Sequence, residues 1–177
     1  GAIAFEPQRV QFRQDLARQR KRSPDPLRAR ICPLDAHFTH QTVFIRIDRI
    51  KLVLESQGYQ ASDLLMKALA IRLNELLQAN HELAKRAFLF RFEGATFGIL
   101  LPNMPDTGHL LLLAEKLLQS MAAPLRVNSQ ELFFTLSIGS SVYPLDGRDA
   151  ENLIRNAEAA INRVTASGGT TFQRYPQ

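Results

Sequence analysis

The alternation of hydrophobic and polar positions is strictest in the middle of the chain. Large apolar residues occupy every second position over 88–92 and again over 97–101, and four small or polar residues separate the two runs. A period of two is that of a β-strand, and Gly94 supplies the backbone freedom that a tight turn needs. The pattern predicts a β-hairpin with Gly94 in its turn.

Other apolar runs predict further strands and a set of helices. Strands are expected at 42–48, 131–144 and 170–176. Helices are expected at 9–22, 49–57, 61–79, 106–123 and 146–164, with Asp149 as the cap of the last one. In the helix at 61–79 the apolar positions at helical spacing are Leu64, Leu65, Ala68, Ile71 and Leu76.

The order of these elements indicates the fold class. After a leading helix it reads β-α-α-β-β-α-β-α-β, and the central hairpin argues against an all-parallel sheet. We expect an α+β fold with a central, mostly antiparallel, five-stranded sheet flanked by helices. Residues 1–40 are interpreted as a leading basic helix and Pro-rich loop of the same domain, and residues 41–177 as its core.

The charge of the chain is concentrated at its beginning. Residues 1–30 contain eight Lys or Arg and three acids, whereas the other 147 residues carry 14 basic and 14 acidic groups. The basic run lacks the interleaved aromatic residues of single-strand binders, so we expect a solvated helix and no nucleic-acid partner. Cys32 is the single cysteine, which excludes an internal disulfide. No apolar stretch approaches the ~20 residues of a membrane span.

Four stretches of the chain, taken together and in order, resemble the GGDEF domain of bacterial diguanylate cyclases. EPQRVQFRQDL is similar to the opening L-P-N-R-x-x-F-x-x-x-L, and FIRIDRIKLVLESQGYQASDLL to the D-x-D-x-F-K segment. RFEGATF stands where R-x-G-G-D-E-F is expected, and SIGSSVYPLDGRDAENLIRNAEAAI follows S-I-G-x-x-x-Y-P-x-D-G. The resemblance implies the nucleotidyl cyclase fold, with a ferredoxin-like palm.

In that family two domains, each holding one GTP, form cyclic di-GMP with the help of magnesium ions held by carboxylates. The departures of this chain fall on those carboxylates. Arg46 replaces the first aspartate of D-x-D, Ala95 replaces the metal-binding acid of the hairpin, and Thr96 replaces the acid after it. Glu93 replaces the first glycine of the tip. The resemblance therefore implies that the magnesium site is lost, and we expect no cofactor.

The implied nucleotide contacts are also altered. Leu54 stands at the position of the base-contacting asparagine, and Thr165 at that of the phosphate-binding lysine. Asp48, Lys51, Asp63 and Gly94 remain. The R-x-x-D motif of product inhibition would need Arg at 84 and Asp at 87, and both positions are alanine.

The resulting expectation is a non-catalytic regulatory or scaffolding domain in cyclic-di-GMP signalling. A sensor that binds GTP or cyclic di-GMP without turnover remains open, as does a cyclase that uses Asp48 and Glu93 as atypical metal ligands. Arg46 is expected to pair with Asp48 or Glu93, with direct phosphate binding as the alternative.

The resemblance also implies a setting for the domain. It implies neighbouring signalling domains, such as an EAL phosphodiesterase domain or a PAS, REC or HAMP sensory domain. It further implies a cytoplasmic location, with a membrane-anchored parent left open. A homodimer remains an open alternative.

Overall fold

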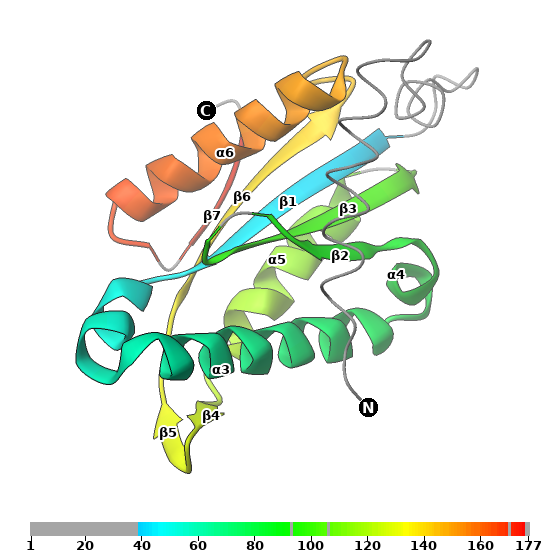
Figure 1. Cartoon of the computed structure of the whole chain (residues 1–177). Helices are drawn as coiled ribbons and strands as arrows, with labels where there is room; N and C mark the ends of the chain where they lie inside the picture. The colour runs from blue at the N-terminus through cyan, green and yellow to red at the C-terminus, as the bar shows by residue number, and fades with distance from the viewer. Residues whose placement is uncertain (1–38, 93, 106, 170, 176–177) are drawn as a thin grey trace, which may run out of the picture.

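The computed structural model describes residues 39–92, 94–105, 107–169 and 171–175 (Figure 1). The helix predicted at 9–22 lies outside these ranges, as does nearly all of the leading region 1–40. Both stay predictions. The described chain forms three helices of more than one or two turns, one short helix and seven strands. Their bounds are β1 Thr39–Ile47, α3 Ile50–Gln78, α4 His81–Arg86, β2 Phe88–Arg91, β3 Thr96–Met104, α5 Gly108–Ser120, β4 Leu125–Val127, β5 Gln130–Leu132, β6 Leu136–Tyr143, α6 Ala150–Ala166 and β7 Thr171–Arg174.

The main sheet has five strands in the order β2-β3-β1-β6-β7. The pairs β2–β3, β3–β1 and β1–β6 are antiparallel, and β7 alone is parallel to its neighbour β6. The predicted α+β class with a mostly antiparallel five-stranded sheet is therefore confirmed. The predicted hairpin is also present, because β2 and β3 flank Gly94, whose φ of 52° suits glycine.

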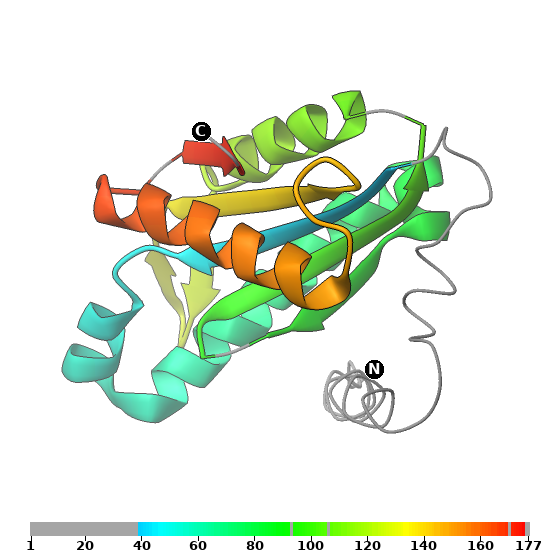
Figure 2. The ribbon, with the colours of Figure 1, turned by 90° about the horizontal axis from the view of Figure 1, so that it is seen from above.

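Helices cover both faces of this sheet. The larger core joins α3 and α5 to the side chains of Val43, Ile45 and Ile47 of β1. The smaller core joins α6 to the opposite face of the sheet, through Phe44 and Ile161. Figure 2 shows α6 in front of the sheet and α3 behind it. Alternate residues of β1 thus enter two different layers.

On the α6 face, phenylalanine and glycine alternate across four neighbouring strands. The register pairs Phe90 with Gly98, Gly98 with Phe44, and Phe44 with Gly139. Each glycine leaves room for a large neighbour. A methyl group at Gly98 would meet the Phe90 ring, and one at Gly139 would meet the backbone of Ile161 in α6. Gly139 therefore sets how closely α6 approaches the sheet, and Gly98 leaves room for the Phe90 ring.

The segment α3 agrees with its prediction in one respect and differs in another. The two helices expected at 49–57 and 61–79 are confirmed, because α3 consists of two helical segments that meet at a kink at Gly58, whose φ is 85°. The expected apolar face is partly wrong, because Leu64 and Ile71 are exposed. The buried face consists of Val53, Ala61, Leu65, Met66, Leu69, Ala70, Leu73 and Leu77. Apolar residues stand on both sides of this helix, so their spacing alone does not identify the buried side.

Two elements escaped the sequence pattern. The short helix α4 begins after Asn80, whose side chain accepts hydrogen bonds from the backbone of Glu82 and Leu83. The strand predicted at 131–144 is two strands, since β5 pairs with β4 in a separate hairpin and β6 begins only at Leu136. The cap predicted for the last helix is confirmed, because the Asp149 carboxylate accepts a hydrogen bond from the Asn152 backbone at 2.8 Å.

Arg72 joins α3 to the turn that follows α5. Its guanidinium donates to the carbonyl oxygens of Ser120 at 3.2 Å, Ala123 at 2.6 Å and Pro124 at 2.5 Å. These carbonyls lie at a helix end, where a cation is favourable.

We expect Arg72→Met to lower the free energy of unfolding by about 2–3 kcal/mol, because two partly buried carbonyls and one exposed carbonyl lose a charged donor. Urea unfolding measures this loss. Arg126→Met is the matched control, since the ion pair of Arg126 with Glu131 is exposed on both sides and its removal changes stability by less than about 1 kcal/mol. Equal effects of the two changes would contradict the role given to Arg72.

Candidate functional site

The residues singled out in the sequence gather where β1 ends. Arg46 and Asp48 alternate with the core residues Ile45 and Ile47, so both side chains lie on the α6 side of the sheet. Register places Arg46 between Thr96 of β3 and Ser137 of β6. Arg46, which replaces the first aspartate of D-x-D, and Thr96, which replaces the second acid of the hairpin, are therefore direct neighbours on adjacent strands.

The guanidinium of Arg46 contacts two other altered positions, Thr96 and Thr165, together with Asn162. Its Nε donates to Thr96 Oγ1 at 3.2 Å, and its Nη1 donates to Asn162 Oδ1 at 3.1 Å and to Thr165 Oγ1 at 3.4 Å. We call these four residues the Arg46 cluster. The cluster joins β1, β3 and α6 across the α6 face of the sheet. All three of these described partners are neutral side chains.

The structure gives Asp48 a different environment. Its two carboxylate oxygens accept hydrogen bonds from Thr135 Oγ1 and Ser137 Oγ, both at 2.5 Å. A methyl group at Gly169, whose φ is 76°, would lie 2.4 Å from the same carboxylate. The loop after α6 therefore passes directly over Asp48. Hydroxyl groups hold this acid against β6, on the other side of β1 from Thr96, and its role here is to fix the strand end.

Arg46 is predicted to form an ion pair with Asp48 or Glu93, and the structure describes only the first of these two acids. The described hydrogen bonds of Arg46 and Asp48 lead to different residues, and those of Arg46 go to neutral groups. Glu93, the other expected partner, lies outside the described residues. The pairing with Glu93 therefore stays a prediction.

The described residues of the hairpin tip, Gly94 and Ala95, offer no polar side chain to a ligand. Gly94 is exposed, and Ala95 packs against the larger core. Arg91 donates from Nε to the Gly94 carbonyl oxygen at 3.0 Å, which holds a second guanidinium beside the tip. At the two positions of the tip where the family pattern has carboxylates, this chain has the methyl group of Ala95 and the hydroxyl group of Thr96.

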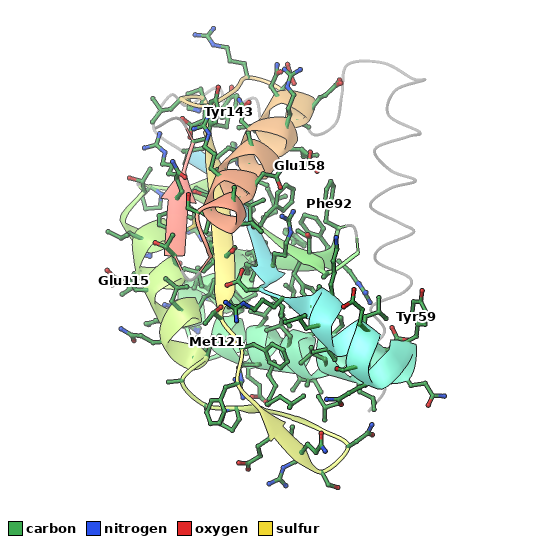
Figure 3. The ribbon with its side chains drawn as sticks, turned by 90° about the vertical axis from the view of Figure 1, so that its left-hand side faces the viewer. Tyr59, Phe92, Glu115, Met121, Tyr143 and Glu158 are labelled. Atoms are coloured by element: carbon green, nitrogen blue, oxygen red, sulfur yellow. The ribbon has the colours of Figure 1, made fainter. Side chains whose placement is uncertain are left out.

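The other residues of the predicted nucleotide site lie on α3, away from the described contacts of Arg46. Lys51 and Asp63 are exposed, and Leu54 is half-buried. The kink at Gly58 separates Leu54 from Asp63. Figure 3 shows the neighbouring Tyr59 projecting away from the domain, and its side chain is 79% exposed. No described hydrogen bond joins these positions to the Arg46 cluster.

These residues do not fit a magnesium ion. Magnesium prefers hard oxygen ligands, above all carboxylates. Within the part of the chain that the structure describes, no three His, Cys, Asp or Glu residues lie close enough to hold a metal. The Arg46 cluster instead places a guanidinium between a threonine of the hairpin and the polar residues of α6.

Comparison with known sequences identifies the family. The profile described as "Diguanylate cyclase, GGDEF domain" matches residues 12–171 of this chain. The chain belongs to the GGDEF family. GGDEF domains act in cyclic-di-GMP signalling, and this GGDEF domain carries EGATF at the hairpin that names the family.

Relatives of this GGDEF domain are longer signalling proteins. It is 30% identical over 134 residues to the cyclic di-GMP phosphodiesterase NbdA of Pseudomonas aeruginosa, which covers 75% of this chain and 16% of that protein. It is 34% identical over 134 residues to a signalling protein of Caulobacter vibrioides, and this match also covers 75% of this chain and 16% of that protein. The chain therefore spans about a sixth of the length of these relatives.

Solved GGDEF structures share the fold. The GGDEF domain of YfiN (TpbB) from Pseudomonas aeruginosa superposes with a TM-score of 0.76 at 20% identity, covering 96% of each chain. An EAL/GGDEF domain protein from M. capsulatus superposes with a TM-score of 0.71 at 26% identity, covering 88% of this chain and 100% of that one. Among the described helices of this GGDEF domain, none has the length and apolar character needed to cross a membrane.

Sequence reasoning missed several members of this site. Asn162 stands in α6 one turn from Thr165, and its approach to Arg46 depends on how α6 crosses the sheet. Thr135 and Ser137 meet Asp48 only because β6 pairs with β1 in the observed register. The small polar pattern of SGG at 167–169 indicates a loop, but nothing in it indicates contact with Asp48.

Proposed function

We propose that this chain is a non-catalytic GGDEF domain that serves a cyclic-di-GMP signalling protein as a regulatory or scaffolding unit. The observation that carries the proposal is the position of the Arg46 guanidinium. It bonds to Thr96, at the second acid position of the hairpin, next to Ala95 at the metal-binding position.

Electrostatics supports this proposal. At about 4 Å, and with an effective dielectric constant of about 20, like charges repel by about 4 kcal/mol per pair of unit charges. A divalent ion would double that figure. Water could replace one lost ligand, but neither water nor threonine compensates for a fixed cation at the same place.

The environment of Asp48 argues against a cyclase with rearranged ligands. Asp48 is one of two acids that such an enzyme would use, and its oxygens are engaged by Thr135 and Ser137. A metal would have to share these oxygens with the two hydroxyl donors and to approach past the Gly169 loop, which lies against the same carboxylate. Guanine recognition also lacks support, because Leu54 has no amide with which to contact a base.

The relatives support the wider setting. NbdA is a cyclic di-GMP phosphodiesterase, and the M. capsulatus structure is that of an EAL/GGDEF domain protein. We propose that this domain likewise adjoins an EAL phosphodiesterase domain, with sensory domains of PAS, REC or HAMP type as further neighbours. Structures of DgcB from Caulobacter crescentus contain cyclic di-GMP, so this ligand is a second candidate for the domain.

The test is an assay of the purified chain with GTP and Mg²⁺ or Mn²⁺, beside an active diguanylate cyclase. We expect neither cyclic di-GMP nor pyrophosphate. Turnover that disappears in Asp48→Ala, which removes one of the two acids left near the site, would contradict the proposal.

A matched variant restores the acids. In Arg46→Asp/Ala95→Asp/Thr96→Glu, we expect Mg²⁺ to raise the melting temperature, whereas it leaves that of the natural sequence unchanged. Stabilisation of the natural sequence by millimolar Mg²⁺ would also contradict the proposal.

A further inference from the structure

We propose that the α6 side of the β2–β3 hairpin is a docking surface for residues 9–22 of this same chain. We call this surface the β2–β3 face. Its members are Phe88, Phe92 and Leu100 of the hairpin, with Ile154 and Glu158 of α6 along its border. The inference concerns an interaction within the chain, and it holds whether or not the domain turns over GTP.

The helix α6 covers only part of its side of the sheet. Its packing is mainly with β6, β1 and β7, and Figure 1 shows it displaced from β2 and β3. Phe88 and Phe92 flank the buried Phe90 at a period of two, so all three side chains point to the α6 side. Phe88 is 58% exposed, and Phe92 and Leu100 are only partly buried.

The other described helices lie on the opposite side of the sheet. Helices α3, α4 and α5 all bury side chains in the larger core, which is the core on that side. Within the described part of the chain, the β2–β3 face therefore has α6 at its border and no helix of its own. A sheet is stable when each apolar face is covered by another layer.

The border that α6 gives to this face is acidic. Glu151, Ile154, Glu158 and Asn162 follow one another at intervals of three or four residues, so they share one side of the helix. Ile154 packs against the smaller core, and the Asn162 side chain reaches Arg46 of β1, so this side of α6 is the one turned toward β3. Figure 3 shows Glu158 and Phe92 on the same side of the domain.

The neighbouring basic residues point elsewhere. On α6, the guanidinium of Arg155 donates to Asn152, and that of Arg163 lies over the ring of Tyr175, which follows β7. On the hairpin, Arg91 pairs with a residue of the larger core and so points to the α3 side of the sheet. The β2–β3 face is thus an apolar surface with glutamates along one border.

Residues 9–22 have the complementary composition. They lie outside the described residues and are considered by sequence alone. Six of the 14 residues are Lys or Arg, and Asp15 is the one acid. Phe12 and Leu16 are four positions apart, which places them on one side of the predicted helix. An apolar side flanked by arginines matches an apolar face bordered by glutamates.

The connection is long enough for this contact. Residues 23–38 join the segment to Thr39, the first residue of β1, and when extended they span up to about 50 Å. The strand β1, which lies beside β3, is only about 30 Å long. A tethered segment also has a high effective concentration at the face, which favours it over a separate partner.

The test uses fluorescence of the full chain, which has no tryptophan of its own. Phe12→Trp places a single reporter in the segment. We expect blue-shifted emission and acrylamide quenching at least threefold weaker than that of free N-acetyltryptophanamide, both independent of protein concentration. Protection that rises with protein concentration, together with a dimer in size-exclusion chromatography, would assign the segment to a second copy and overturn the inference.

The deciding variant is Leu100→Gln in the Phe12→Trp background, with circular dichroism as the check on folding. We expect at least a twofold rise in quenching, because the face loses apolar contact. Ile71→Gln is the matched control, since Ile71 is 44% exposed on α3, which packs on the other side of the sheet, and we expect no change. If Leu100→Gln does not fold, Glu151→Gln/Glu158→Gln replaces it, and we expect a smaller rise in quenching and a loss of its salt dependence.

Three results would overturn the inference. The first is emission and quenching like those of the free tryptophan derivative before any change to the face. The second is an equal effect of Leu100→Gln and Ile71→Gln. The third is protection that survives both Leu100→Gln and the double glutamate change, which would place the segment elsewhere. None of these measurements involves GTP, so a failure here leaves the proposed function untouched, and synthesis of cyclic di-GMP would overturn that function alone.

Discussion

Gly139→Ala is expected to lower the free energy of unfolding by about 3 kcal/mol or more, enough to leave much of the protein unfolded at 37 °C. The added methyl group would lie 2.3 Å from the backbone nitrogen of Ile161 and 2.7 Å from its Cα. A backbone cannot rotate aside, so α6 as a whole would have to move away from β6. Urea unfolding of the purified variant measures the effect.

The matched variant is Gly98→Ala. Its methyl group would come equally near, 2.3 Å, but to the outer end of the Phe90 ring. Phe90 stands on the edge strand β2, where the ring can shift, so we expect a loss of about 1 kcal/mol. If both variants lose the same stability, helix-to-sheet spacing is not what Gly139 sets.

Asp146→Ala is expected to cost about 3–5 kcal/mol, the second large effect, because it leaves a partly buried arginine unpaired. Asp146 is 4% exposed and forms a bidentate ion pair with Arg174, at 3.1 and 3.2 Å. The same carboxylate accepts a hydrogen bond from the Val142 backbone at 2.8 Å. One side chain therefore joins the end of β6 to β7.

A double-mutant cycle with Arg174→Met isolates the pair. We expect Arg174→Met to cost less than Asp146→Ala, because Val142 keeps its acceptor, and the two changes together to cost less than their sum. Glu131→Ala serves as a control, since the Arg126–Glu131 pair is exposed. If the losses of stability from the two single changes simply add, Asp146 stabilises the protein through its hydrogen bond with the Val142 backbone and not through the ion pair with Arg174.

Sequence patterns predicted the features that depend on neighbouring residues. The β2–β3 hairpin followed from its alternation around Gly94, and the start of α6 from Asp149. Asn128 and Ser129, both with positive φ, form the turn of the β4–β5 hairpin. An Asn-Ser pair is a turn signal, and the prediction of one long strand at 131–144 did not use it. The buried side of α3 could not be predicted, because Leu64 and Ile71 face outward while apolar residues also line its core side.

The candidate site likewise has features that the sequence predicted and features that it could not predict. That Arg46, Ala95 and Thr96 replace carboxylates is visible in the sequence. That Arg46 bonds to Thr96, Asn162 and Thr165 depends on strand register and on the path of α6, which bring together residues 50 to 119 positions apart. The hydroxyl contacts of Asp48 depend on the pairing of β1 with β6 in the same way.

The close approach of α6 at Gly139 also decides which parts of the domain open together. With the helix backbone directly against β6, and Phe44 and Phe92 stacked at 4.7 Å on the same face, the central strands and α6 form one cooperative unfolding unit. Strand β5 and the short helix α4 lie outside that unit, because β5 has no fully buried side chain and α4 buries only Leu83. Local opening should begin there, while the Arg46 cluster, which spans β1, β3 and α6, keeps its geometry until the domain unfolds as a whole.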